Sequence, residues 1–228
     1  MISFNQEEFN NFVLDRNVIG FFKEPRTLAS GRESHWYANW RNVASDVCSL
    51  DILADYVLGF IENTGLQPDC YYGVPEGATK LGIITQYKLA MRSPFHRFGS
   101  HSLAMGRGKP KNHGDPKNKY FIGQPIGKTI VLEDVTTTGG SLLRTIDNLL
   151  EVKTKIIAAV SLINRMELGY DGHSIKEAIE TKRIPYLSMS NALELLPKAY
   201  KLLNPGENIA KAIEEEFERY GVEKLKLI

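Results

Sequence analysis

The sequence is poor in cysteine, in long apolar runs and in any excess of one charge, and each shortage excludes a class of protein. Its two cysteines, Cys48 and Cys70, are too few for a disulfide framework and lack the spacing of metal ligands. No apolar run approaches the roughly 20 residues of a membrane span. The polar and acidic segment 1–10 is not typical of a signal peptide. The 28 basic and 27 acidic residues leave a formal net charge of +1, which gives no general attraction to nucleic acid or to a membrane.

These absences predict a cytoplasmic protein whose cysteines are buried thiols in a reducing compartment. The histidines His35, His96, His101 and His173 show no metal-ligand spacing, so we expect no metal held mainly by side chains. The chain of 228 residues is long enough to bury a substantial core, and we expect residues 1–228 to form a single domain.

The expected helices and strands alternate along the chain. Helices are predicted at 6–16, 47–63, 79–91, 140–152, 191–203 and 206–220. Strands are predicted at 70–74, 93–98, 129–135, 155–164 and 184–190. This alternation predicts an α/β protein with a mainly parallel central sheet flanked by helices. The apolar run at 155–162 lacks polar alternation, which is typical of a strand covered on both faces.

The segment 105–127 breaks this alternation. It is rich in glycine, proline, lysine and asparagine and poor in apolar residues, so it cannot bury enough surface to order itself well. A loop of this length inside a compact domain is usually functional or disordered. The concentration of cations indicates a lid over an anion, and a solvated surface excursion is the alternative interpretation.

The stretch TIVLEDVTTTGGSLLRTI, residues 129–146, places Glu133 and Asp134 at the end of an apolar strand. Ligands of parallel sheets bind beyond the carboxyl ends of the strands. The turn of threonines and glycines that follows leads into a helix near Ser141, and a helix N-terminus suits phosphate. Carboxylates suit ribose hydroxyls or Mg²⁺, so the stretch predicts a sugar-phosphate site. An acidic strand end with a helix cap explains one carboxylate or Ser141, but it does not explain both carboxylates and the turn together.

Five segments of the chain resemble, in order, the type I phosphoribosyltransferases, and among these the orotate phosphoribosyltransferases most of all. VLEDVTTTGGS (131–141) is similar to their signature for 5-phosphoribosyl 1-pyrophosphate (PRPP). TLASGRESHWYAN (27–39) resembles their N-terminal segment, and YGVPEGATKLG (72–82) their pyrophosphate loop. RGKPKNHG (107–114) resembles their flexible catalytic loop, and LINRMELG (162–169) a later strand whose arginine contacts the base.

The resemblance implies a type I phosphoribosyltransferase fold with a small hood built from about residues 1–45 and a flexible catalytic loop at 105–120. It implies that orotate and PRPP are converted to orotidine 5′-monophosphate and pyrophosphate, a step of pyrimidine biosynthesis. Mg²⁺ is the implied cofactor, bound mainly through PRPP. The implied assembly is a homodimer in which the 105–120 loop acts on the neighbouring site, with no nucleic acid or membrane as partner.

The resemblance also implies roles for individual residues. The implied catalytic residues are Arg107, Lys111, His113 and Asp134. The implied PRPP-binding residues are Val74, Pro75, Glu76, Gly77, Lys80, Glu133, Asp134, Thr136, Thr137, Thr138, Gly139, Gly140 and Ser141. The implied orotate-binding residues are Tyr37, Thr137 and Arg165.

The chain departs from the family pattern at two cations. The family usually has a lysine before the Ser-Gly-Arg, where this chain has Ala29, and often a lysine in the pyrophosphate loop, where it has Gly77. Lys80 lies three residues further on, about one helical turn or roughly 5 Å, so it can reach the same region. These departures leave open a phosphoribosyltransferase for a purine or another base, and a non-catalytic regulator that senses PRPP.

Other interpretations of single residues stay open at this stage. Arg165 can be an ion-pair partner of Glu167, and Trp36 and Tyr37 can be core residues. His113 can be a solvated loop histidine, and retention of the loop cations favours catalysis over sensing.

Overall fold

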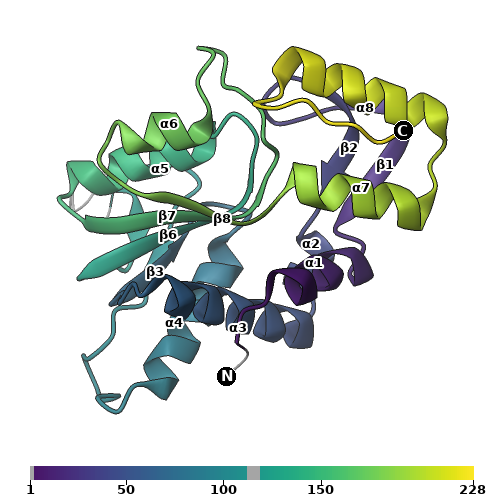
Figure 1. The fold of residues 1–228 in the computed structure, drawn as a ribbon. Helices are drawn as coiled ribbons and strands as arrows, with labels where there is room; N and C mark the ends of the chain where they lie inside the picture. Colours follow the sequence, from purple (N-terminus) through teal and green to yellow (C-terminus); the bar gives the residue numbers. More distant parts are fainter. Residues whose placement is uncertain (1–2, 112–118) are drawn as a thin grey trace.

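The computed structural model describes residues 3–111 and 119–228, which fold around a four-stranded parallel sheet (Figure 1). In chain order the elements are α1 (Gln6–Asp15), β1 (Ile19–Thr27), β2 (Glu33–Ala38), α2 (Arg41–Ser45), α3 (Val47–Thr64), β3 (Cys70–Gly73), α4 (Thr79–Arg92), β4 (Met105–Gly106), β5 (Phe121–Ile122), β6 (Lys128–Thr136), α5 (Gly140–Glu151), β7 (Lys155–Asn164), α6 (Ile175–Glu180), β8 (Tyr186–Asn191), α7 (Ala192–Leu203) and α8 (Glu207–Tyr220). The predicted α/β class and parallel sheet are confirmed.

The central sheet has the strand order β3-β6-β7-β8, and every neighbouring pair is parallel. The register places Thr136 at the end of β6 opposite Asn164, and Asn164 opposite Asn191 at the end of β8. Three strands therefore end level with one another. The sheet presents one carboxyl edge on which residues distant in sequence meet.

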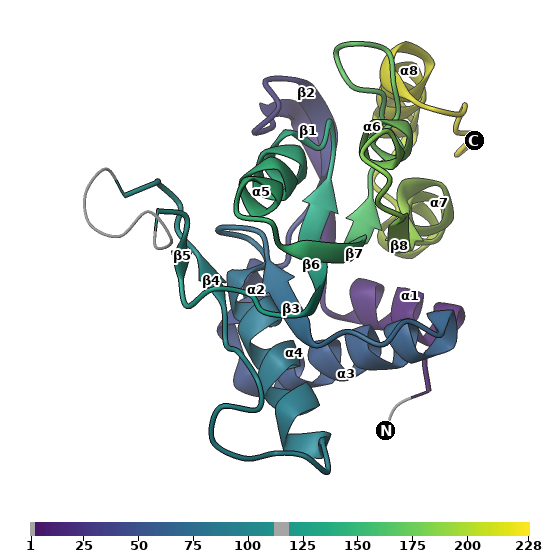
Figure 2. The same ribbon diagram turned by 90° about the vertical axis from the view of Figure 1, so that its left-hand side faces the viewer.

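Both faces of the sheet are buried, which explains the unbroken apolar runs of its strands. Ile130 and Leu132 of β6 belong to one core cluster, together with residues of α1, α3 and α7. The intervening Val131 belongs to a second cluster with Leu142 and Ile146 of α5 and residues of α6. Helices lie on both sides of the sheet in Figures 1 and 2. Alternate side chains of one strand thus enter different cores, and neither face can be polar.

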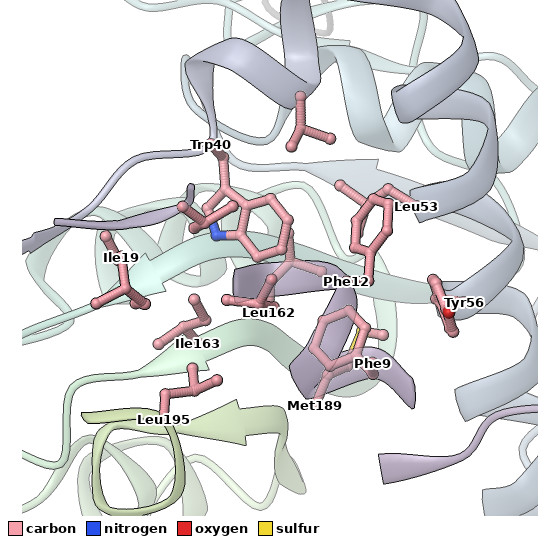
Figure 3. Packing of buried hydrophobic residues seen from close by; sticks show 14 of the residues in the cluster. Phe9, Phe12, Ile19, Trp40, Leu53, Tyr56, Leu162, Ile163, Met189 and Leu195 are labelled. Atoms are coloured by element: carbon pink, nitrogen blue, oxygen red, sulfur yellow. The ribbon is translucent and has the colours of Figure 1, made fainter. Parts of the chain in front are cut away.

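Aromatic residues link helix α1 to the rest of the larger core. The ring of Phe9 meets that of Tyr56 edge-on at 5.5 Å between centroids and stacks with Trp40 at 6.3 Å. Figure 3 shows these rings together with Phe12 and Leu53. The packing joins α1, α3 and the segment after the β1–β2 hairpin into one body.

The hood is an antiparallel hairpin, β1–β2, held against the C-terminal helix α8. Glu216 of α8 accepts hydrogen bonds from the His35 N–H at 2.7 Å and from the Ser34 hydroxyl at 2.7 Å. Helix α1 packs into the main core instead. The hood is therefore assembled from both ends of the chain.

The segment 93–98 is not a strand, so that prediction is wrong. Pro94 removes a backbone donor, and side chains satisfy the local backbone: the Phe95 N–H donates to Ser93 Oγ at 3.2 Å and the Arg97 N–H to Ser100 Oγ at 3.1 Å. The local hydroxyls favour turns over a sheet ladder. The prediction that both cysteines are buried is also wrong, because only Cys70 is buried and Cys48 is exposed.

A two-stranded ribbon, β4–β5, begins the excursion between residues 105 and 122. Beyond it the Arg107 N–H donates to Tyr120 O, and the Lys111 N–H to Lys119 O, both at 2.8 Å. Figure 2 shows this ribbon extending away from the central sheet. In the described residues, no helix has the length and apolar character needed to cross a membrane.

Candidate active site

Two cavities flank the end of β6 at the carboxyl edge of the sheet. The first, here called the turn cavity, has a volume of about 360 Å³. It is lined by Ala29, Ser30, Glu133, Val135, Thr137, Thr138, Gly139, Gly140, Ser141, Arg144 and Tyr170. The second, the loop cavity, has a volume of about 450 Å³. It is lined by Tyr37, Ala38, Asn39, Trp40, Arg41, Ala44, Ser45, Glu76, Gly77, Lys80 and Asp134.

The two predicted carboxylates lie between these cavities, one lining each. Successive side chains of a strand point to opposite faces, so Glu133 lines the turn cavity and Asp134 the loop cavity. Glu133 is only 5% exposed. Burial, followed by the charge of Asp134, raises the pKa of the Glu133 carboxyl well above its ordinary value. The pair therefore offers two carboxyl groups in different surroundings to the same edge, one buried and one lining the open loop cavity.

The Thr/Gly turn ends at Gly139, which has a left-handed backbone with φ of 76° and caps helix α5. A Cβ at this position would lie 1.9 Å from Ile175 Cδ1, so glycine is required by both conformation and space. No side chain caps the first turn of α5. Its N–H groups and the hydroxyls of Thr137, Thr138 and Ser141 are arranged around the turn cavity, which suits an anion.

The Thr136 hydroxyl points away from this turn, and the predicted contact of Thr136 with PRPP stays a prediction. Its side chain is buried, and its Oγ1 lies 2.7 Å from the Tyr186 hydroxyl, which in turn lies 2.7 Å from Ser161 Oγ. Its carbonyl accepts the Arg165 N–H at 2.9 Å. As the last residue of β6, Thr136 points into the core and anchors the strand to β7 and β8.

The predicted pyrophosphate loop, residues 74–77, has only part of its backbone N–H groups available to a ligand. The Val74 N–H donates to Leu132 O at 2.8 Å and thereby extends the sheet, and Pro75 has no N–H. Within the described residues, the N–H groups of Glu76 and Gly77 donate to no other backbone group. The available donors of this loop are therefore at positions 76 and 77.

The glycine at position 77 has a structural cause. A Cβ there would lie 2.3 Å from Asp134 Oδ2 and 2.6 Å from Asp134 Cγ. Any larger residue, including the lysine of the family pattern, has to displace this carboxylate. Lys80 lies on the first turn of α4, lines the same cavity as Asp134, and donates from Nζ to Ala44 O at 3.0 Å. The structure thus brings Lys80 to the loop cavity, as its sequence position suggested.

The first residues of the predicted catalytic loop run beside the predicted pyrophosphate loop. A Cβ on Gly106 would lie 2.4 Å from Pro75 Cγ, and one on Gly108 would lie 2.6 Å from Glu76 Oε1. Arg107, between these glycines, donates from Nε to Phe121 O at 3.0 Å. Lys111 is exposed. His113 lies outside the described residues.

Arg165 lines neither the turn cavity nor the loop cavity, so its geometry favours the alternative interpretation as an ion-pair partner, and its predicted contact with a base stays a prediction. The side chain is 1% exposed and forms an ion pair with Glu167, Nε to Oε1, at 2.7 Å. It also donates to Ser34 Oγ at 2.9 Å and stacks on the Trp36 ring at 3.7 Å. Arg32 shares the same carboxylate at 3.0 Å. A buried guanidinium needs such partners, and the alternative of an ion pair with Glu167 is confirmed.

The aromatic pair of the hood divides into two roles. Trp36 is fully buried beneath Arg165, whereas the half-buried Tyr37 lines the loop cavity next to Gly77 and Asp134. Tyr37 is therefore placed beside the predicted site, and Trp36 belongs to the core.

The sequence analysis missed three polar residues of the turn cavity, Ser30, Arg144 and Tyr170. Ser30 has a buried Oγ without a hydrogen-bond partner in the described residues. Tyr170 donates its hydroxyl to Ser30 O and closes the cavity from the segment after β7. Arg144 enters from α5. The helical spacing of Arg144 from Gly140, four residues, was the signal that could have identified it.

The carboxyl groups of Glu133 and Asp134 also determine which kind of metal ion suits this site. The described residues contain no group of three or more histidine, cysteine, aspartate or glutamate side chains arranged as metal ligands. Two adjacent carboxyl groups at an open edge instead suit a hard cation that keeps waters and takes its other oxygens from a phosphorylated ligand, as Mg²⁺ does.

Comparisons with known proteins agree with this geometry. No family model matches the chain. It is 30% identical over 171 residues to the orotate phosphoribosyltransferase of Thermococcus gammatolerans, covering 75% of this chain and 82% of that protein. It is 27% identical over 224 residues to that of Marinobacter nauticus, covering 95% and 98%. The crystal structure of the Francisella tularensis orotate phosphoribosyltransferase shares the fold, with a TM-score of 0.66 and 24% identity over 94% of this chain and 99% of that one. The chain belongs to the orotate phosphoribosyltransferase family.

Proposed function

We propose that the protein transfers the phosphoribosyl group of PRPP to orotate, giving orotidine 5′-monophosphate and pyrophosphate. The family assignment supports this activity. The single structural observation that carries it is the position of Glu133 and Asp134 between two cavities. A ribose at the carboxylates would have its 5′-phosphate on one side and its pyrophosphate on the other.

The proposed division of roles follows the donors that each cavity contains. Residues 137–141 and the first turn of α5 hold the 5′-phosphate. Asp134 and Glu133 accept from or donate to the ribose hydroxyls. The N–H groups of Glu76 and Gly77, together with Lys80, hold the pyrophosphate. The N–H groups of Glu76 and Gly77 have no other backbone partner in the described part of the chain, and the first turn of α5 has no side-chain cap.

The chemical step asks mainly for positioning and charge. The bond between ribose C1 and the pyrophosphate oxygen breaks while N1 of orotate bonds to C1 and loses its proton. Positive charge develops on the sugar and negative charge on the leaving group. Holding the two reactants in line and neutralising the pyrophosphate therefore supply most of the catalysis.

The loop cations complete the neutralisation in this proposal. Arg107 and Lys111 lie in the first arm of the excursion, which starts beside Pro75 and Glu76, so closure brings positive charge to the leaving group. We assign His113 to the same neutralisation because the segment 107–114 resembles the catalytic loop of the family. Closure also excludes water, which would otherwise hydrolyse the activated sugar.

Orotate is proposed to lie against Tyr37 and Thr137, which line the two cavities on either side of the carboxylates. Arg165 acts indirectly, because its buried ion pair and its stacking on Trp36 fix the strand that carries Tyr37. Orotate brings its own negative charge, so it needs donors rather than a strong base.

Mg²⁺ is the proposed cofactor, held mainly by the oxygens of PRPP with Asp134 beside it. When bound, it adds positive charge to the pyrophosphate and to the ribose hydroxyls. The unpaired Cys48 and Cys70 support the expected reducing, cytoplasmic compartment.

The test is a panel of bases with PRPP and Mg²⁺, following pyrophosphate release. We expect orotate to be the best base. Turnover of adenine, guanine or hypoxanthine with none of orotate would contradict the assignment. Tight PRPP binding without turnover of any base would favour the regulator.

A further inference from the structure

One cation of the turn cavity has no assigned role. Arg144 lies on the exposed side of α5, four residues after Gly140, and lines the cavity with residues 137–141. Its Nη1 lies 3.6 Å from where a Cβ on Gly140 would be, so the guanidinium folds back towards the start of the helix. Among the described residues it forms no hydrogen bond, ion pair or ring contact.

The position is electrostatically unfavourable unless an anion joins it. The N-terminus of a helix carries a partial positive charge, so cations are disfavoured there and anions are favoured. The first turn of α5 has no side-chain cap that would offset this charge. The one carboxyl group lining the cavity is that of the buried Glu133, whose raised pKa makes it a poorer counter-charge than an exposed carboxylate. Uncapped N–H groups and a guanidinium thus face the same space with little negative charge to offset them.

Ala29 lies in the same cavity, at the position where the family pattern has a lysine. We propose that Arg144 supplies from the helix the positive charge that this chain lacks at position 29, and that it binds the 5′-phosphate of PRPP. The inference rests on the proposed function for the identity of the sugar phosphate. A guanidinium can form two parallel hydrogen bonds to phosphate oxygens, which an ammonium cannot.

The test separates the two ends of the donor with two probes, ribose 5-phosphate and inorganic pyrophosphate, titrated calorimetrically. Arg144→Gln should weaken ribose 5-phosphate binding by about tenfold or more, the usual effect of losing a charged hydrogen bond. Pyrophosphate binding should change by less than about twofold. Glutamine is a good helix former, so the exposed site should tolerate it. Lys176→Gln removes a nearby exposed cation outside both cavities and is the matched control, expected to change neither affinity.

A rescue variant excludes a merely structural role. Ala29→Lys placed in the Arg144→Gln background returns a cation to the same cavity and should recover most of the ribose 5-phosphate affinity. Equal loss for both probes, or no loss in Arg144→Gln, would overturn the inference. If Arg144 governs ribose 5-phosphate binding but the unmodified protein does not use orotate, the proposed function fails while this inference stands.

Discussion

At the residue scale, the acidic pair shows how one strand end serves two neighbouring groups. Glu133 is buried with a raised pKa, whereas Asp134 lines the open loop cavity and accepts the Val135 N–H at 2.8 Å. Two carboxyl groups that look equivalent in the sequence therefore have different surroundings in the fold. The two residues give separate predictions.

Asp134→Asn should lower kcat/KM for PRPP by at least about tenfold without unfolding the protein. The amide keeps an oxygen for the Val135 N–H but removes the charge offered to the ribose and to Mg²⁺. Steady-state kinetics measure the loss, and thermal unfolding checks the fold. Asp15→Asn, an exposed aspartate on α1, is the matched control. Unchanged kinetics, or a collapsed protein, would make Asp134 a structural residue.

Glu133→Gln should stabilise the ligand-free protein at high pH. A carboxyl group whose folded pKa is raised contributes stability below its unfolded pKa of 4.5 and loses it as the pH rises towards the folded value. Glutamine does not titrate, so the variant does not lose this stability. Its melting temperature at pH 8 should exceed that of the unmodified protein by roughly 2–4 °C, the shift that a stability gain of about 1 kcal/mol produces in a chain of this size.

The difference should shrink as the pH falls well below 4.5, since both side chains are then neutral in both states. Thermal unfolding without PRPP at the two pH values measures it. A constant difference across the range, or a less stable variant at pH 8, would contradict the raised pKa. Loss of PRPP binding in the same variant would show that Glu133 lowers the stability of the protein at high pH but is needed to bind PRPP.

At the scale of the element, the turn before α5 joins packing to ligand binding. Gly139 has a left-handed backbone, and it is tightly packed against Ile175 of α6. The same contact that fixes the turn also fixes the first N–H groups of the helix. A defect there should appear in both stability and PRPP affinity.

Gly139→Ala should lower the free energy of unfolding by about 2–4 kcal/mol, combining a left-handed alanine with an overpacked contact. Gly172→Ala is the matched control, because Gly172 also has a positive φ, of 80°, but nothing within 4 Å of its would-be Cβ. It should cost only about 1 kcal/mol, the conformational part. Denaturant unfolding of both variants measures the difference, and equal losses would show that the Ile175 contact does not matter.

The elements that the sequence predicted well are those set by local patterns. The helix over 47–63 and its stop at Gly65 are confirmed, since α3 ends at Thr64 and Gly65 has φ of 74°. The strand at 129–135 and the following turn are also confirmed. Periodicity, caps and glycine conformations are local properties, so one chain suffices to read them.

What the sequence did not predict depends on contacts between distant segments. The hairpin β1–β2 is held by Glu216 from the other end of the chain. The position of the Arg165 side chain depends on its hydrogen bonds to Ser34 and Trp36, about 130 residues earlier. The direction of the Thr136 side chain depends on Tyr186. No local pattern contains these distant partners, so the sequence alone did not show where these side chains lie.

At the scale of the whole molecule, the segment between α4 and β4 exposes several large apolar side chains. Tyr87 and Met91 on α4 and Phe95, Phe98 and Leu103 in the segment that follows are all more than half exposed. Large apolar side chains exposed along one segment favour a role in an interaction surface. A second copy of the chain is the expected partner, because this segment leads directly into β4 and the catalytic loop.

The last prediction tests whether that loop acts on the neighbouring site of a homodimer. Lys111→Ala impairs the loop and Asp134→Ala the carboxylate pair, so each variant alone should be nearly inactive. If the loop acts across the interface, a mixed dimer contains one site with both defects and one with neither. Subunit exchange between equal amounts should then restore about one site in four. A loop acting within its own chain leaves a defect in every site and restores nothing. A fully active monomer, shown by sedimentation at the assay concentration, would refute the dimer itself.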